Sequence, residues 1–397
     1  MYTIQSRSFD FKILACGFRR TDPDDIGRDK CGLLYKDLMK QKERISYIYD
    51  NGLNHVYVSV RNEICPEPLV PKILKSRASL KLFDIMQYIS LDCTSFLDIC
   101  AGPGAMSDLL LKSYDCTGVG VTICQDDKSK QFYPDLENND KYDIASIDDG
   151  DVTRLEVISD VAAICEAKYG KNNVDLIVAD GAPSLEYHQE DHQEVYAQKI
   201  ILSEIITGLE CLKRHGKFVI KIFDTFTKFS RSVVFLFSKM FNQVKIIKPR
   251  SSRATNSEKY LVGIDLMLMD EKRIDLLANL QFILTNFKDG YNCEEFINLE
   301  VDSRFDKTFG CAMTELANEQ IICLTKILDE IDKRIFKVAP EPRQKEQSKG
   351  KGKGKGKSKG KRAAPYVPQI RNDKEYVSHV RNDQEYSPFD DESIFPD

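Results

Sequence analysis

The chain of 397 residues contains no tryptophan, only 5 histidines and no long hydrophobic run. No stretch approaches the roughly 18 uncharged apolar residues that a membrane-spanning helix needs, so we expect no membrane partner. The first twenty residues mix charges with short apolar pairs and lack the apolar centre of a secretory signal. These absences predict an intracellular protein, in the cytoplasm or the nucleus.

The 12 cysteines are scattered and form no C-x-x-C pair, so the sequence indicates no zinc site. We expect such thiols to be reduced. His188 and His192 stand four residues apart among carboxylates, but a third metal ligand is undefined. We interpret this segment as a solvated loop or helix start and expect no metal. The net charge of -5 does not exclude a nucleic-acid-binding protein, because such a protein needs a local basic groove rather than a positive net charge.

Four regions follow one another along the chain. Residues 1–70 form an extension without an interpretable motif. Residues 71–270 alternate short apolar runs with amphipathic stretches, and residues 271–340 are predicted to be mainly helical. Residues 341–397 form a polar tail. In the tail, lysine alternates with glycine or serine between 349 and 362, which predicts disorder. The near-copies IRNDKEY (370–376) and VRNDQEY (380–386) are interpreted as a short linear motif or a duplication remnant.

The alternation within 71–270 predicts an α/β fold with a mostly parallel, Rossmann-like sheet. The last two apolar runs are joined only by PRSSRATNSE (249–258), so we expect them to form an antiparallel hairpin that closes the sheet edge. The expected strands are 95–100, 117–123, 174–180, 217–223, 244–247 and 260–267. The expected helices include about 191–214 and 227–241.

The first motif with chemical content is FLDICAGPGAMS (96–107), a strand followed by a glycine-rich turn and a helix start. Gly102 and Gly104 allow a ligand to approach the backbone closely, and the helix start offers free N–H groups. A tight turn without a ligand, or a site for NAD or phosphate, would have the same pattern. Pro103 between the glycines counts against a dinucleotide.

Two strands end in, or contain, a charged residue. VDLIVADGAPS (174–184) ends its apolar run at Asp180, where ligands of open α/β sheets bind; capping of the next turn is the alternative. GKFVIKIFD (216–224) contains Lys221 within an apolar run, where a lysine is costly to bury unless it is paired or functional. A lysine at the strand edge that reaches solvent is the alternative.

The fourth motif is KPRSSRATNSEKYLV (248–262), in which two arginines, several hydroxyls and Glu258 precede a strand. These side chains suit contacts with phosphate and sugar. A polar surface hairpin is the alternative interpretation.

The order and spacing of these four motifs resemble the FtsJ-like (RrmJ-type) 2′-O-methyltransferases, most closely their cap-specific mRNA branch. That branch has D-x-C-A-G-P-G-G-F-S, A-D-G-G, G-G-x-F-x-x-K-x-F-D-x-F-T-x-F-S and K-P-x-x-S-R-x-x-N-S-E-x-Y. This chain has DICAGPGAMS, ADGA, HGKFVIKIFDTFTKFS and KPRSSRATNSEKY in that order over about 75–265. Ala105 and Met106 depart from the family pattern. The resemblance implies a Rossmann-like methyltransferase domain that uses S-adenosyl-L-methionine to methylate a ribose 2′-hydroxyl of capped RNA.

The resemblance also implies a catalytic tetrad of Lys81, Asp180, Lys221 and Glu258. Lys75 is the alternative to Lys81 as its first member. In this assignment Lys221 is the general base, because burial, Lys81 and the sulfonium disfavour its ammonium form. Asp180 and Glu258 orient the two lysines. The cofactor contacts that match the family pattern are Asp98, Cys100, Ala101, Gly102, Gly104, Asp151 and Asp180. RNA contacts are assigned to Arg250, Ser251, Ser252 and Arg253.

Two other functions stay open. One is the same chemistry on ribosomal or transfer RNA, although CAGPG and FDTFTKFS favour the cap branch. The other is a catalytically inactive RNA-binding subunit, although a non-enzyme has no physical reason to keep two lysines in a buried pocket. The lysine-rich tail either contacts RNA phosphates without sequence choice or is simply solvated.

Overall fold

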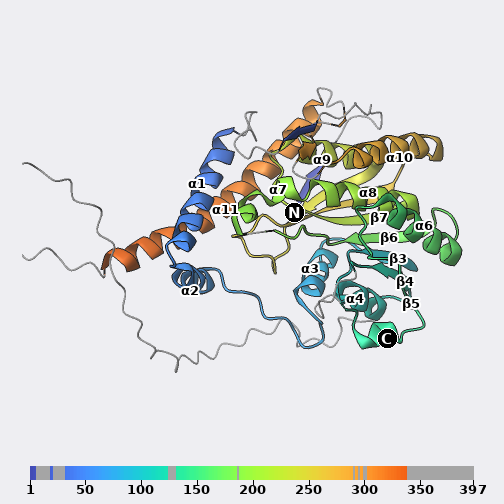
Figure 1. The fold of residues 1–397 in the computed structure, drawn as a ribbon, viewed down its shortest axis with the longest axis horizontal. Coiled ribbons are helices and arrows are strands. Elements are labelled where there is room, and N and C mark those ends of the chain that lie inside the picture. Colours follow the sequence, from blue (N-terminus) through green and yellow to red (C-terminus); the bar gives the residue numbers. More distant parts are fainter. Residues whose placement is uncertain are drawn as a thin grey trace, which may run out of the picture. The chain divides into compact units, whose positions relative to one another are not determined.

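The computed structural model describes residues 1–5, 18–20, 32–123, 131–185, 187–288, 291–293, 296–297 and 302–337. The expected lysine-rich tail and the duplicated R-N-D-x-E-Y motif lie outside these residues. Residues 1–336 form one unit. At its centre is a mixed sheet with helices on both faces (Figure 1).

The sheet has eight described strands in the order β1-β8-β9-β7-β6-β3-β4-β5. The parallel strands are β3 (Ser95–Ile99), β4 (Thr117–Val121), β5 (Tyr142–Ile144), β6 (Val174–Ala179) and β7 (Leu212–Ile222), and all of them except β5 were expected. β9 (Lys259–Leu266) is antiparallel to both of its neighbours, β7 and β8 (Phe241–Ile247). The expected α/β fold with an antiparallel last strand is therefore confirmed.

Three details of the sheet differ from the sequence prediction. β5, which pairs with β4, is not among the expected strands, because its three residues are too few to show a period. The hairpin of β8 and β9 does not close the edge, because β1 (Tyr2–Ile4) pairs antiparallel with β8 outside it. A three-residue strand among mixed charges gives no periodicity by which it could be recognised. β7 begins at Leu212 rather than at 217, because polar residues that resemble a loop continue the strand through a register shift opposite β6.

Helices cover both faces of the sheet. One face carries α3 (Arg77–Met86), α4 (Ala105–Ser113) and α5 (Pro134–Glu137). The other carries α6 (Leu155–Tyr169), α8 (Gln198–Cys211), α9 (Lys228–Met240) and α10 (Asp270–Thr285). The helix expected over 191–214 is divided into a 3-10 helix at Tyr187–His192, α7 (Gln193–Tyr196) and α8.

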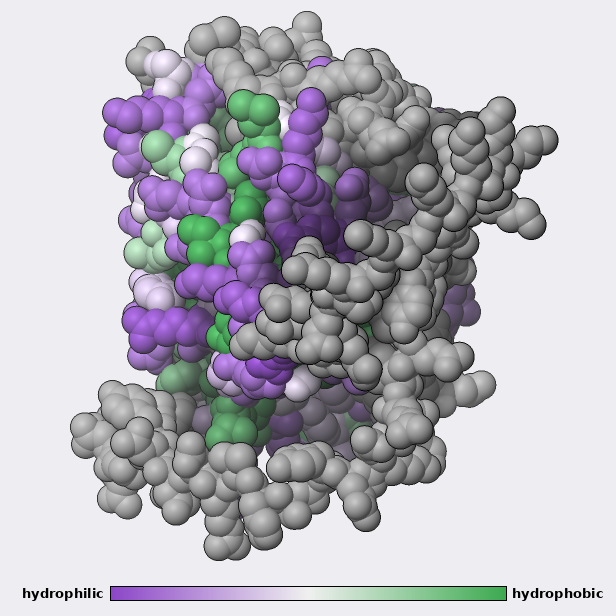
Figure 2. All heavy atoms as spheres, turned by 90° about the vertical axis from the view of Figure 1, so that its left-hand side faces the viewer, coloured by the Kyte–Doolittle hydropathy of each residue, from purple (hydrophilic) through white to green (hydrophobic). Residues whose placement is uncertain are grey.

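A helical cluster forms from the two ends of this unit. α1 (Gly32–Asp50) and α2 (Asn54–Ile64) pack on α11 (Ser303–Lys337) through a small apolar core of Ile48, Tyr57, Val60, Ile327, Leu328 and Ile331. An ion pair of Arg334 with Glu63 at 2.6 Å joins α11 to α2. Figure 2, which faces this side of the molecule, shows a mostly hydrophilic surface with a narrow run of hydrophobic residues.

The region after α10 is mainly helical, as expected, but its described part also contains a strand. β10 (Tyr291–Cys293) pairs antiparallel with β2 (Phe18–Arg20) in a separate two-stranded sheet. Within the described ranges, no helix is long and apolar enough to cross a membrane.

Candidate active site

Neighbouring strands bring three of the four tetrad candidates together at the end of the sheet where the parallel strands have their carboxyl ends. Asp180 directly follows β6, Lys221 lies near the end of β7, and Glu258 directly precedes β9. β7 pairs with both β6 and β9, and β9 runs in the opposite direction, so these positions are adjacent. Lys81 comes from α3, whose first turn is fixed by a capping box.

The four side chains form one continuous hydrogen-bonded cluster. Lys221 Nζ lies 3.1 Å from Asp180 Oδ1 and donates to the main-chain oxygen of Asp180 at 2.6 Å. Lys81 Nζ lies 2.6 Å and 2.9 Å from the two carboxylate oxygens of Glu258. The Tyr260 hydroxyl joins these two pairs, at 2.8 Å from Asp180 Oδ1 and 3.0 Å from Glu258 Oε1. The structure therefore brings the four candidates together and adds Tyr260 to them.

Lys75, the alternative to Lys81, lies outside this cluster. Its Nζ pairs with Asp135 at 2.6 Å and faces the Tyr133 ring at 5.3 Å. Asp135 is largely exposed. Of Lys75 and Lys81, it is therefore Lys81 that pairs with Glu258.

The charge state of Lys221 differs from the sequence expectation. Burial lowers the pKa of Lys221, but the carboxylates of Asp180, Glu258 and Glu204 outweigh it, so the pKa is raised. We expected burial and Lys81 to lower this pKa. The difference arises because Glu258 holds Lys81 in an ion pair, while Asp180 lies at hydrogen-bond distance from Lys221. In this arrangement Lys221 is an ammonium ion.

Glu204 of α8 is a buried acidic residue beneath the cluster, and the sequence analysis missed it. Its Oε1 accepts a 2.7 Å hydrogen bond from the Gly181 N–H, and its buried Oε2 has no partner. A Cβ at Gly181 would collide with this carboxylate, which explains the glycine. Burial raises the pKa of Glu204 to about 8. α8 also contains Glu210, so the glutamate at position 204 gave no separate signal in the sequence.

The glycine-rich turn lies at the carboxyl end of β3 and leads into α4. Cys100, Gly102 and Gly104 have φ angles of 58°, 58° and 88°, so this turn needs left-handed backbone at three positions. No atom lies within 4 Å of where a Cβ of Gly102 would stand, so the backbone is open there. Ala101 N–H donates to the main-chain oxygen of Val121 at 2.9 Å, which ties the turn to β4.

The two departures from the family motif are accommodated in α4. Ala105 and Met106 are both buried at the start of this helix. Neither has a positive φ angle, so the left-handed part of the turn ends at Gly104.

Asp98 and Asp151 lie at the same edge of the sheet. Asp98 is buried; its Oδ2 accepts a 2.6 Å hydrogen bond from Ser107 Oγ, while its buried Oδ1 has no partner. Burial raises the pKa of Asp98 to about 7. Asp151 follows Gly150, whose Cα lies so close to the main-chain oxygen of Thr122, after β4, that a Cβ would collide with it. Asp151 Oδ1 accepts from the Thr153 N–H at 2.9 Å.

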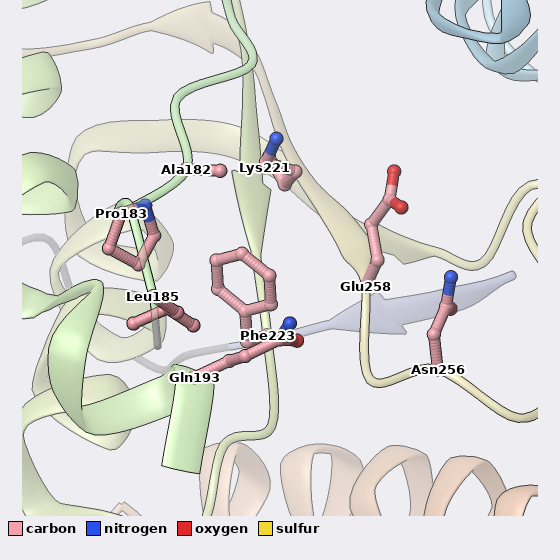
Figure 3. A pocket seen from close by; sticks show the side chains of 8 residues that line it. All are labelled: Ala182, Pro183, Leu185, Gln193, Lys221, Phe223, Asn256 and Glu258. Atoms are coloured by element: carbon pink, nitrogen blue, oxygen red, sulfur yellow. The ribbon is translucent and has the colours of Figure 1, made fainter. Parts of the chain in front are cut away.

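Lys221 and Glu258 line a cavity of about 210 Å³. Figure 3 shows the Lys221 amine and the Glu258 carboxylate at one end of it, with the Phe223 ring below them. The remaining lining residues come from the loop after β6, from α7 and from the loop before β9: Ala182, Pro183, Leu185, Gln193 and Asn256. The cavity therefore combines a charged end with an apolar wall.

The expected RNA-contact residues differ in whether their polar groups already form hydrogen bonds or ion pairs within the protein. The N–H and Oγ of Ser251 both donate to Asp84 Oδ2, at 2.7 Å and 2.6 Å. Ser252 Oγ donates to Asn256 Oδ1 at 3.1 Å. Arg253 pairs with Glu67 at 3.0 Å, whereas Arg250 is exposed. The two serines thus fix the shape of the loop before β9.

A buried three-residue ion network connects α1 to this region. Asp224 lies 3.0 Å from Lys42 Nζ and 3.2 Å from Lys259 Nζ. Burial opposes ionisation of Asp224, but the two lysines lower its pKa to about 2. Lys42 also donates to the main-chain oxygen of Asp191 at 2.9 Å. The sequence analysis missed this network, because Lys42 belongs to the region without a motif.

In the part of the chain that the structure describes, no group of three histidine, cysteine, aspartate or glutamate side chains is placed to hold a metal ion. The side chain of His188 lies outside that part.

The mixed sheet and the charged cluster at the carboxyl ends of its strands lie within a segment that resembles the methyltransferases. Residues 74–266, just under half of the chain, match the family model of the FtsJ-like methyltransferases.

The chain is similar to curated proteins named cap-specific mRNA (nucleoside-2′-O-)-methyltransferase 1. The Trypanosoma brucei brucei protein is 27% identical over 313 residues, which cover 72% of this chain and 82% of that protein. The Homo sapiens protein is 36% identical over 213 residues, which cover 52% of this chain and 25% of that protein. A solved structure of a putative ribosomal RNA methyltransferase from Plasmodium falciparum has 18% identity and a TM-score of 0.38, covering 49% of this chain and 99% of that one. A likeness at that level carries no argument about the substrate.

Proposed function

We propose that this protein is a mRNA cap 2′-O-ribose methyltransferase that uses S-adenosyl-L-methionine and converts a cap 0 end to cap 1. The observation that carries the proposal is the cluster of two lysine–carboxylate pairs, joined by Tyr260, beside a cavity at the carboxyl edge of the sheet. The relatives named above support the capped substrate.

The general base in this proposal is Lys221. A ribose 2′-hydroxyl is a poor nucleophile, so its proton must be accepted as the new oxygen–carbon bond forms. Lys221 Nζ lines the cavity, and the carbonyl and carboxylate oxygens of Asp180 fix its direction. The proton of the hydroxyl would pass to Nζ of Lys221, which accepts it only in its neutral form, whereas the surrounding carboxylates by themselves favour the ammonium form. Glu258 balances the charge of Lys81, and the remaining acceleration comes from alignment of the reacting groups.

The residues at the ends of β3 and β4 suit the cofactor. The unpartnered, buried Oδ1 of Asp98 and the open backbone at Gly102 are features that a bound polar ligand satisfies. Asp98, Cys100, Ala101, Gly102, Gly104, Asp151 and Asp180 would hold S-adenosyl-L-methionine. When bound, it supplies the methyl group and a positive sulfonium charge. Such a charge near Lys221 would oppose the effect of the carboxylates on its pKa and would favour the neutral amine.

The cavity would receive the ribose to be methylated. Phe223, Leu185 and Pro183 form an apolar wall for the sugar or base, and Asn256 adds a polar contact. Lys221 at the charged end would then meet the 2′-hydroxyl. Arg250, Ser251, Ser252 and Arg253 are retained as the RNA side of the site, with Arg250 as the exposed contact.

The test compares capped and uncapped transcripts of one sequence with radiolabelled cofactor. We expect label in the capped RNA, confined to the ribose of its first nucleotide. Equal labelling of both transcripts would contradict the cap substrate and leave ribosomal or transfer RNA as the alternative. Binding of RNA without labelling of either transcript would favour the catalytically inactive subunit.

A further inference from the structure

A single peptide group, the one between Asp180 and Gly181, has an ionisable side chain on each side. Its N–H donates to Glu204 Oε1 at 2.7 Å, and its carbonyl oxygen accepts from Lys221 Nζ at 2.6 Å. The peptide group is trans, so its N–H and carbonyl point in opposite directions within one plane. The position of the Glu204 carboxyl therefore fixes the direction of the carbonyl that Lys221 contacts.

The sheet itself holds this peptide group only weakly. The ladders of β6 with β3 and with β7 both end at Ala179, one residue before Asp180. The Asp180 N–H donates to the main-chain oxygen of Ile99 at 3.3 Å, which is long for such a bond. The hydrogen bond from Gly181 to Glu204 therefore fixes the backbone directly beyond the point where strand pairing stops.

The packing of α8 against the end of β6 leaves this peptide group little freedom. Glu204 is completely buried, and Gly181 is buried beside it. A Cβ at Gly181 would collide with both Glu204 and Ile200, so the glycine lets the backbone approach α8 closely. The carboxyl of Glu204 thus sets the distance between α8 and the residues that follow β6.

The same carboxyl acts on the charge of Lys221. Burial raises the pKa of Glu204 to about 8, and the side chains that modify this effect are Lys221, Asp180 and Cys100 of the glycine-rich turn. The carboxyl is therefore mostly protonated near neutral pH. Against the effect of burial, its carboxylate form helps Asp180 and Glu258 to raise the pKa of Lys221. The protonated form thus leaves Lys221 freer to become a neutral amine.

We propose that Glu204 is a positioning residue for methyl transfer. It holds the peptide group after Asp180 so that the carbonyl oxygen directs Lys221 Nζ into the cavity where the ribose would lie. Glu204 lies beneath this cavity rather than in its wall, so its effect reaches the ribose through Lys221. This inference rests on the proposed function.

The first test compares two variants of Glu204. Glu204→Met removes the hydrogen-bond acceptor at similar length, and Glu204→Gln keeps the acceptor but cannot ionise. The turnover number for capped RNA is measured near neutral pH, and thermal unfolding confirms that each variant folds. We expect Glu204→Met to lose at least about tenfold, because the carbonyl that directs Lys221 is no longer fixed. Glu204→Gln should stay within about threefold of the wild type, because its side-chain oxygen replaces the acceptor.

Glu210→Met provides the matched control for this comparison. Glu210 lies on the same helix but accepts a hydrogen bond from Gln281 of α10, at 3.0 Å. The turnover number of Glu210→Met should therefore resemble that of the wild type.

The second test needs no RNA. Acetic anhydride acylates only neutral amines, and Lys221 Nζ lines the cavity, so its rate of modification reports how much of the amine is neutral. Mass spectrometry follows the modification, with the exposed Lys228 as the reference. As the pH rises from about 7 to 9.5, only the wild type gains a carboxylate at position 204. Lys221 should therefore become modified several-fold faster in Glu204→Gln than in the wild type at the upper end of this range.

A wild-type turnover number for Glu204→Met would overturn the inference. Equal modification of Lys221 in the wild type and in Glu204→Gln over the whole pH range would also overturn it. If the wild type methylates capped RNA in either case, only the role of Glu204 is wrong. If the wild type methylates no RNA while the modification of Lys221 changes as expected, the proposed function is wrong and the effect of Glu204 on Lys221 stands.

Discussion

Tyr260 holds its hydroxyl 2.8 Å from Oδ1 of Asp180 and thereby joins the Lys221 pair to the Lys81 pair. The hydroxyl has one proton, while Glu258 Oε1 lies 3.0 Å away on its other side. Burial, and then the two carboxylates, raise the pKa of Tyr260 well above its usual value, so the hydroxyl keeps its proton. Tyr260 is thus a shared donor that fixes the separation of the two carboxylates.

Tyr260→Phe removes this donor and keeps the ring. We expect the turnover number for capped RNA to fall about ten- to a hundredfold, since a hydrogen bond to a charged group contributes roughly 1.5–3 kcal/mol. Cofactor affinity should stay near that of the wild type, because Asp98 and the glycine-rich turn are unchanged. Steady-state kinetics and calorimetry measure the two effects. An unchanged turnover number would show that Tyr260 is only a packing residue.

Glu204→Gln tests the buried carboxyl beneath the site through the pH dependence of stability. The pKa of Glu204 is raised to about 8 in the folded protein, from 4.5, so its contribution to stability is complete below about pH 4.5 and is lost as the pH rises to 8. The wild type should therefore lose on the order of a few kcal/mol over this range. The glutamine variant cannot ionise there, so its stability should fall less with pH. Parallel stability–pH curves for the two proteins would contradict the raised pKa.

Lys42→Met tests whether α1 is anchored to the active-site region through Asp224. Asp224 keeps Lys259 but loses its other cation, so we expect a loss of about 1–3 kcal/mol in the free energy of unfolding, the cost of one missing partner at a buried polar group. Lys40→Met, an exposed position on the same helix, is the control and should be near neutral. Combining Lys42→Met with Asp224→Asn should cost less than the sum of the two single changes, as measured by denaturant unfolding. Strict additivity would mean that the two side chains do not interact energetically.

The sequence predicts the part of the site that depends on local pattern. β6, β7 and β9 contain apolar runs, and the motifs around Asp180, Lys221 and Glu258 stand at their ends. Their meeting follows from the parallel order of β6 and β7 and the reversed direction of β9.

The remainder of the site depends on contacts between distant positions. Lys42 and Asp224 are 182 positions apart, and no periodicity links them. Glu204 and Glu210 both lie in α8, and the sequence alone gives no sign that the fold buries the first more completely than the second. The raised pKa of Lys221 depends on the distances to three carboxylates, which the sequence does not contain.

The assignment of Lys221 as the general base is tested most directly by single-turnover methyl transfer to capped RNA. Lys221→Ala is compared with Lys228→Ala, an exposed lysine seven residues further along, while cofactor binding is measured by calorimetry. We predict that Lys221→Ala loses at least about a hundredfold in rate and keeps its cofactor affinity, whereas Lys228→Ala resembles the wild type. A rate for Lys221→Ala close to that of the wild type would contradict the assignment.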